Sequence, residues 1–443
     1  MSLVNSGKRL YFEKMNKSIV KRLLIVMLLV LVSVGVYAQA DVESPYSVFG
    51  VGQLANKSMN VRLKGMGGLK NAMFGSGLIN SGNPASYAKI DSLAFLFDAG
   101  FYFKTSSFST SNLTEQAANA SFDHISMAFG LTDWWKLSLG VQPYSTMGYT
   151  MLVDSRDPSV GNYTTAFKGS GGLNQAVIGT AFRIGKHFSV GANAKYVYGD
   201  SKTVATLYFP DSIYMLGSRR SVDLMVSSFK FDYGLLYNTE LGSDYGLSVG
   251  VTYDQQIGLR GKKTTFIRTI AANSYSEIEY LIDTAFYEVE GQSKLTMPQG
   301  FGVGFALQKN NKWCLGVDFD WMQWSRFAHD EVNDSLNDSW RVTAGFEYIP
   351  THTSISNYFK RITYRVGGFY EHSYVSVRGH DLDKMGISVG ASLPLPRTLS
   401  KVNLALEVGR YGTKLDGLIQ ENYLKLDVSV SVFERWFIKR KYK

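Results

Sequence analysis

The stretch WCLGVDFDW, residues 313–321, alternates strictly between large apolar residues and small or acidic ones. Every odd position from Trp313 to Trp321 is large and apolar, whereas the even positions hold Cys, Gly and Asp. Successive side chains of an extended strand point to opposite faces, so this strand has one apolar face and one small, acidic face. Such a strand is typical of a wall between an apolar medium and a polar interior.

The same alternation recurs along most of the chain. A strand of about 9–11 residues, when tilted, crosses the hydrocarbon layer of a membrane. We count about fourteen segments of this kind, near residues 93–104, 121–131, 136–149, 173–183, 187–198, 224–238, 245–258, 297–308, 312–324, 339–349, 361–376, 383–393, 401–412 and 422–437. The pattern predicts an all-β fold: a transmembrane antiparallel β-barrel of about fourteen strands. A soluble β-sandwich is the alternative, but its outward face would be polar.

The connections between the segments fall into two classes. Short ones lie at residues 132–135, 184–186, 240–244 and 309–311, and long loops are expected at 150–172, 199–223, 259–296 and 325–338. One rim of short turns and one rim of long loops is typical of outer-membrane barrels. Aromatic residues at segment ends, among them Tyr245, Trp313 and Trp436, predict girdles at the two membrane interfaces.

The first 38 residues read as an export signal. Lys17, Lys21 and Arg22 precede an apolar run over residues 23–37, and Ala38 closes a small-residue cleavage site. A retained anchor is the alternative, and Met15 competes with Met1 as the start. We therefore divide the chain into a signal peptide (1–38), an N-terminal segment (39–92) and a barrel (93–443), located in a Gram-negative outer membrane.

Composition argues against several classes of function. The formal charge is +9, but residues 1–38 carry a net +5, so the remainder has only +4 and does not predict nucleic-acid binding. Cys314 is the single cysteine, and the six histidines lack ligand spacing, so we expect neither a metal nor a cofactor. The two G-x-S-x-G matches, at 246–250 and 386–390, lie inside alternating strands rather than at a catalytic elbow, so we expect no enzyme.

Residues 39–92 differ from the rest, because they are rich in Gly, Asn and Ser yet keep apolar residues that need a wall to pack against. The motifs GMGG at 65–68 and NPA at 83–85 resemble the hatch signature of the FadL-type fatty-acid and hydrocarbon transporters. SPYSVFGVG at 44–52 resembles a variant in Bacteroidota members of that superfamily. The resemblance implies an N-terminal plug (hatch) inside the barrel. Its motif residues are Gly65, Gly67, Gly68, Asn83, Pro84 and Ala85. A disordered periplasmic tail is the alternative.

Pro143 interrupts the third strand segment. Proline has no N–H to give to a neighbouring strand, so the ladder loses a bond there. FadL-type proteins are known for a kinked third strand with a lateral gap, and we expect Gly140, Pro143 and Gly148 to shape such an opening. The alternative places Pro143 harmlessly at the outer rim.

Charged residues of mixed sign fall on the inward face of the strands. They include Asp98, Asp318, Asp320, Glu347, Arg365, Glu407 and Asp427. Charges in a narrow lumen need partners, so we expect a paired network that braces lumen and plug. An ion-selective filter is the alternative.

Two functions compete. The first is passive transport of a hydrophobic small molecule, of fatty-acid or hydrocarbon type, with a lateral exit into the outer-membrane lipid. The alternative is a non-transporting FadL-like subunit of a protein secretion or barrel-assembly complex, whose partners are other outer-membrane subunits. A transporter should have an apolar pocket that reaches toward Pro143. A structural subunit should have a filled lumen and an exposed apolar patch on its loops or turns.

Overall fold

The structure is a computed structural model that describes residues 44–55, 60–212, 214–271, 280–309, 312–333, 335–354, 357–396 and 398–435. The predicted signal peptide, Asn310 and Asn311 of a predicted turn, and Trp436 lie outside these residues. None of the helices in the described part of the chain is both long and apolar enough to cross a membrane.

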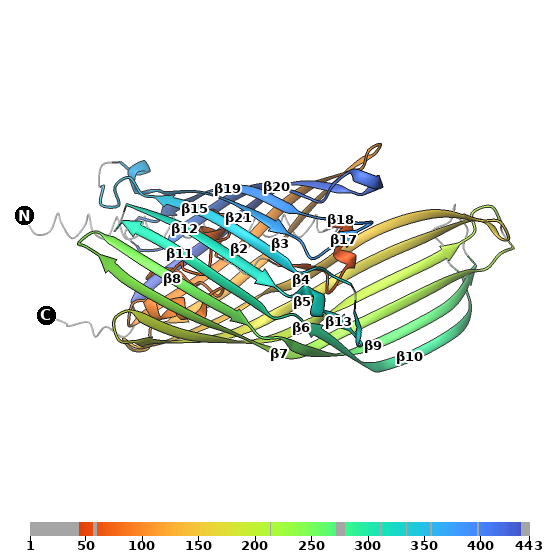
Figure 1. Cartoon of the computed structure of the whole chain (residues 1–443), viewed down its shortest axis with the longest axis horizontal. Coiled ribbons are helices and arrows are strands. Elements are labelled where there is room, and N and C mark those ends of the chain that lie inside the picture. The colour runs from red at the N-terminus through yellow and green to blue at the C-terminus, as the bar shows by residue number, and fades with distance from the viewer. Residues whose placement is uncertain are drawn as a thin grey trace, which may run out of the picture. The chain divides into compact units, whose positions relative to one another are not determined.

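Fourteen antiparallel wall strands close into one barrel, which confirms the predicted all-β fold (Figure 1). Two of these wall strands each consist of two consecutive elements. The wall strands are β2 (Ala94–Ser109), β3 (Thr114–Phe129), β4 (Trp135–Asp157), β5 (Gly161–Ile184), β6 (Phe188–Tyr208), β7 (Gly217–Leu241), β8 (Tyr245–Asp254) continued by β9 (Ile257–Ala271), β10 (Tyr280–Met297) continued by β11 (Gly300–Lys309), β12 (Trp313–Met322), β15 (Ser339–Tyr348), β16 (Thr363–His372), β19 (Lys384–Pro394), β20 (Lys401–Tyr411) and β21 (Gln420–Arg435). The ring closes where β2 pairs with β21, from Ala94 opposite Arg435 to Ser109 opposite Gln420.

Short elements lie at the rims and along the N-terminal segment. They are η1 (Pro45–Val48), β1 (Gln53–Leu54), α2 (Val61–Lys64), η2 (Pro84–Lys89), η3 (Trp324–Arg326), β13 (Ala328–His329), β14 (Val332–Asn333), η4 (Phe359–Arg361), β17 (Ser376–Val377), β18 (His380–Asp381) and η5 (Leu415–Gly417).

The alternation in the sequence maps onto the two faces of the wall. On β11, Phe301, Val303 and Phe305 are 46%, 37% and 55% exposed on the outside. Gly304 lies between them on the inside, where a Cβ would come within 2.7 Å of the Asn71 side chain. Large apolar groups outside and small ones inside are what a lipid-facing barrel with a filled lumen requires.

The prediction of long loops is wrong at three of its four places. The structure has mostly strand at residues 150–172, 199–223 and 259–296. The strands β4–β7 run for 21–25 residues, and β9 and β10 lengthen the next two wall strands. The alternation weakens in these stretches, but neighbouring strands still satisfy each other's backbone groups, which overrides weak local propensity. The outer parts of β4–β7, β9 and β10 form what we call the projecting sheet, which extends past the ends of β12 and β15 in Figure 1.

Candidate functional site

The N-terminal segment (described residues 44–55 and 60–92) hydrogen-bonds to inward-facing residues of many strands around the ring. Tyr87 on η2 contacts Asn193 on β6, and the Gly67 N–H donates to the Ser388 hydroxyl on β19. Between them, the Ser248 hydroxyl on β8 donates to the Ala72 carbonyl, 3.0 Å away. Ser248 and Ser388 are the centres of the two G-x-S-x-G matches, and both bond to this segment.

The glycine and NPA motifs lie where the segment meets the wall most closely. A Cβ on Gly65 would come within 3.1 Å of the Gly390 backbone. Gly67 and Gly68 have φ values of +75° and +90°, which suit glycine. The Asn83 side chain caps η2 by accepting from the Ala85 N–H at 3.0 Å, and Pro84 occupies the first turn, where its missing N–H does no harm.

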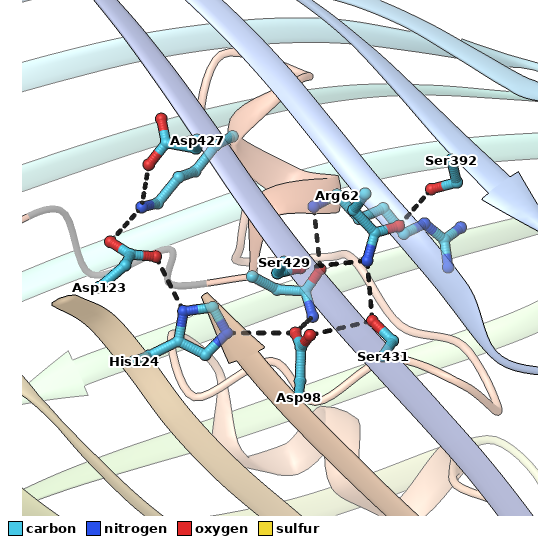
Figure 2. A network of polar contacts seen from close by, with 11 residues as sticks. Arg62, Asp98, Asp123, His124, Ser392, Asp427, Ser429 and Ser431 are labelled. Atoms are coloured by element: carbon cyan, nitrogen blue, oxygen red, sulfur yellow. Dashed lines mark hydrogen bonds and ion pairs between the residues drawn. The ribbon is translucent and has the colours of Figure 1, made fainter. Parts of the chain in front are cut away.

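A buried polar cluster joins the start of this segment to β2, β3 and β21 (Figure 2). Asp98 accepts from the Asn60 amide at 2.5 Å and from the Ser431 hydroxyl at 3.0 Å, and His124 lies 3.2 Å from it. The Lys64 ammonium lies 2.8 Å from Asp427 and also pairs with Asp123. Asp98 and Asp427 were predicted as inward residues, whereas their partners Asn60, Lys64 and His124 were not.

Two further predicted carboxylates hold basic or backbone groups of the segment. Glu347 accepts from Arg62 at 2.7 Å and from Arg365 at 2.7 Å, so one carboxylate joins two guanidinium groups. Asp318 accepts from the backbone N–H groups of Lys70 and Asn71, at 2.6 and 2.8 Å.

The two remaining predicted acids differ in what they bind. Asp320 pairs with the Lys70 ammonium at 2.7 Å. Glu407 instead accepts from the Tyr423 hydroxyl at 2.8 Å, within the wall. The sequence analysis did not predict that the basic residues Arg62, Lys64 and Lys70 pair with the predicted acids. The signal for that role was the presence of three cations in a Gly-rich apolar stretch.

A second, apolar contact lies near the outer rim of the barrel. Trp324 and Phe327 are fully buried there and pack with Val51 of the N-terminal segment and with inner-wall residues such as Leu259. Tyr374 stacks on Trp324 with ring centroids 4.0 Å apart, and its hydroxyl donates to the Gly52 carbonyl. This cluster therefore covers the inner wall at the level where the projecting sheet begins.

The space between the outer cluster and the polar contacts is small and charged. A cavity of about 240 Å³ remains. Its lining includes Lys64, Lys70, Lys104, Asp123, Asp320, Arg341, Glu371, Lys384, Glu407 and Lys425, together with Pro143 and several aromatic residues. An uncharged apolar ligand gains little from such a lining, because its entry would desolvate charged groups.

The wall is interrupted between β3 and β4. These strands pair only from Phe129 opposite Leu137 to Ile125 opposite Val141, although both continue outward. Pro143 lies two residues past the last pair, and the pairing of β4 with β5 is irregular between Pro143 and Ser145. Gly140 lies before the break, within the paired stretch. We call the unpaired stretch the β3–β4 seam.

The N-terminal segment lies along the β4 side of this seam. β1 pairs with β4, Gln53 opposite Thr146 and Leu54 opposite Ser145. The Ser44 N–H donates to the Gly148 carbonyl, and the Gly148 N–H donates to the Ser47 hydroxyl. The free edge of β4 is thus partly satisfied by the chain's own N-terminal residues.

The fold is that of the FadL-type barrels. The toluene transporter TbuX of Ralstonia pickettii has a TM-score of 0.57 at 12% identity, covering 86% of this chain and 99% of that one. The toluene transporter TodX of Pseudomonas putida has a TM-score of 0.56 at 15% identity (88% and 100% covered). A Pseudomonas aeruginosa FadL homologue has a TM-score of 0.55 at 12% identity (87% and 100% covered). At such identities these likenesses show the fold alone.

By sequence, the chain belongs to the BamG family, whose model matches residues 19–443. No curated protein matches it.

Proposed function

We propose that this chain is a structural subunit of an outer-membrane protein assembly, in which the N-terminal segment plugs the lumen and the projecting sheet binds a partner protein outside the membrane. The observation that carries the proposal is the outer part of β10. Six of its large apolar or aromatic side chains are 47–63% exposed: Tyr280, Leu281, Ile282, Phe286, Tyr287 and Val289.

These side chains lie beyond the level of the outer apolar cluster, between six and fifteen residues from Leu295 along β10. β10 meets the outer apolar cluster at Leu295 and Met297. Leu281 is fourteen residues further out, which corresponds to roughly 45 Å along a strand at about 3.3 Å per residue. Contiguous apolar surface in water marks an interaction site in a soluble region of a protein. We therefore assign this surface to a protein partner rather than to lipid.

The backbone of β10 is also available for pairing. One edge pairs with β9 along its length. On the other edge, the described residues pair with it only at Leu295 and Thr296, through β13, and at Lys294, through Asp330. The outer part of β10 is thus an edge strand, and an apolar edge strand is a template for an added strand.

The lumen supports the same conclusion. Its contents are bound by charge-assisted contacts at one level and by the Trp324 cluster at another, and the cavity between these two levels is lined by charged as well as aromatic residues. A carrier of apolar molecules needs a continuous apolar path, whereas a structural subunit needs only a stable scaffold.

The test is purification of the tagged full-length protein from membranes in mild detergent. Wild-type protein should bring down a stoichiometric partner, and the double variant Leu281→Asp with Phe286→Asp should lose it. Leu113→Asp, at the exposed tip of the β2–β3 hairpin, is the matched control and should retain it. A heat-dependent gel shift should show that all three barrels are folded. No stoichiometric partner, or one retained by the double variant, would contradict the proposal.

Transport of a hydrophobic small molecule is the second candidate, and the β3–β4 seam is the observation that favours it. A molecule in the lumen could leave sideways there if β1 moved away from β4. A disulfide between Leu54→Cys and Ser145→Cys, which are paired positions, would lock β1 in place. If the seam is an exit, oxidation should slow uptake of a labelled fatty acid into proteoliposomes, and reduction should restore it. Uptake no faster than in empty liposomes would exclude transport of that ligand.

A further inference from the structure

The outer wall of the barrel carries a hollow that no role assigned above uses. It lies over β16, β19, β20 and β21, reaches β2 and β3, and has a volume of about 820 Å³. One row of paired, outward-facing residues crosses it: Gly368 opposite Ile387, Ile387 opposite Val408, and Val408 opposite Leu424. Gly368, at one end of this row, has no side chain, so the wall recedes there beside Ile387, which is 67% exposed.

The next row toward the outer rim is polar at one end. Met385 is paired with Arg410, and Arg410 with Asn422. Arg410 is the penultimate residue of β20, so it lies where the strand ends near the outer rim. An arginine on the lipid-facing side is costly at the membrane midplane but not at the interface, where it can meet a headgroup.

The side chains of Arg410 and Asn422 both have hydrogen-bond donors that are not fully used. The nearest polar contact of the Arg410 guanidinium is the Met385 sulfur at 4.0 Å, a weak acceptor, and within the described ranges no carboxylate pairs with it. The Asn422 amide oxygen accepts from Gln420 at 3.1 Å, which leaves its NH₂ group as a free donor among the residues the structure describes. Two neighbouring donors, one of them cationic, suit a phosphate.

We propose that this hollow binds a membrane lipid whose headgroup carries a phosphate. An acyl chain lies in the hollow against Ile387 and Val408, and the phosphate accepts from Arg410 and Asn422. The volume falls within the range of about 300–1,000 Å³ that is typical of small-ligand sites. Lipid is the occupant that the position favours, because the hollow opens on the lipid-facing side of the wall and, among the described residues that line it, the one charged group is the Arg410 cation.

The experiment is native mass spectrometry of the full-length protein, released from an uncharged detergent after titration with phosphatidylglycerol. A neutral glycolipid with the same acyl chains is the phosphate-free comparison, and inorganic phosphate is the chain-free one. We expect one retained phosphatidylglycerol, weaker retention of the glycolipid, and no effect of inorganic phosphate at the same concentration.

Two variants separate the two parts of the site. Arg410→Gln should weaken phosphatidylglycerol binding about tenfold and leave the glycolipid unchanged. Arg260→Gln is the matched control, because Arg260 is exposed on β9, away from the hollow. Val408→Trp should fill the hollow and weaken both lipids, whereas Val303→Trp on β11 should weaken neither.

Three results would overturn the proposal. The first is equal retention of phosphatidylglycerol by wild-type protein and Arg410→Gln. The second is equal retention of the two lipids by wild-type protein. The third is a protein, rather than lipid, crosslinked in cells to a photoreactive residue at Ile387, which would show that the hollow is a protein contact.

Discussion

The two halves of the barrel wall use the same alternating pattern to different lengths. In the short-stranded half, formed by β12, β15, β16, β19 and β20, each strand has 10 or 11 residues, which is enough to cross the membrane once. In the half from β4 to β7 the strands have 21–25 residues. The additional length is not required for crossing, so it must serve a purpose outside the membrane.

The halves also differ in what their polar residues bind. The short-stranded half supplies Asp318, Asp320, Glu347 and Ser388 to the N-terminal segment. The long-stranded half exposes apolar side chains beyond the rim, such as Leu152 on β4 and Met225 on β7. The short-stranded half therefore supplies acidic anchors to the segment, whereas the long-stranded half contacts it through Asn193 and β4 and also exposes the surface that we assign to a partner.

The largest effect on stability should come from breaking an anchor in the short-stranded half. Glu347→Gln leaves the buried Arg365 and the partly exposed Arg62 without their shared carboxylate, and we expect it to lower the free energy of unfolding by about 3–5 kcal/mol. Urea unfolding in detergent, followed by gel shift, measures this. Glu240→Gln, at the exposed end of β7, is the control and should change stability little. A Glu347→Gln variant as stable as the control would contradict the anchoring role.

A smaller loss should follow from crowding the segment against β8, which lies outside the short-stranded half. A Cβ at Gly250 would lie 1.8 Å from the Asn71 carbonyl oxygen, so Gly250→Ala must displace the segment. We expect a loss of about 1–3 kcal/mol. Hydrogen exchange of peptides covering residues 66–80 should also rise. Unchanged exchange there would show that the segment does not rest on β8.

Changes in the projecting sheet should barely affect stability. Leu281→Asp with Phe286→Asp replaces exposed side chains, so we expect a change in unfolding free energy within about 0.5 kcal/mol in the isolated barrel. The same urea titration measures it. A large destabilisation would mean that β10 is part of the barrel's own core, and the contrast between the halves would fail.

A local effect is confined to the loop that carries Trp324. Burial raises the pKa of Asp330, but hydrogen bonds from Lys263, the Lys294 N–H and Ser293 outweigh it and hold the pKa at about 2. A lowered pKa stabilises the loop above the ordinary aspartate pKa of about 4, and that stabilisation is lost as the pH falls through about 2.

Asp330→Asn should therefore loosen residues 323–333 at pH 7 by about 1 kcal/mol, because the contact is partly exposed. Limited proteolysis at pH 7 measures this, with Asp416→Asn on η5 as the control. If cleavage of this loop is equally fast in wild-type protein and Asp330→Asn, the contact with Lys263 does not hold the loop.

The sequence predicted the barrel because alternation in strands such as β11 and β12 reflects a physical boundary between lipid and lumen. It failed on the outer strands, because there both faces meet water or a partner and the period of two no longer carries information. Inward acids such as Glu347 could be identified from their place in a strand. Their partners Arg62 and Lys64 could not, since they belong to a segment without periodicity whose position depends on the completed wall.

The central claim is that the outer part of β10 contacts a protein. Site-specific photocrosslinking in cells tests it directly, with the reactive group at Tyr287 and a comparison at Leu406, which is on the lipid-facing side of β20. The account predicts one discrete protein adduct at Tyr287 and none at Leu406. The absence of a protein adduct at Tyr287 in folded, membrane-inserted protein would contradict it.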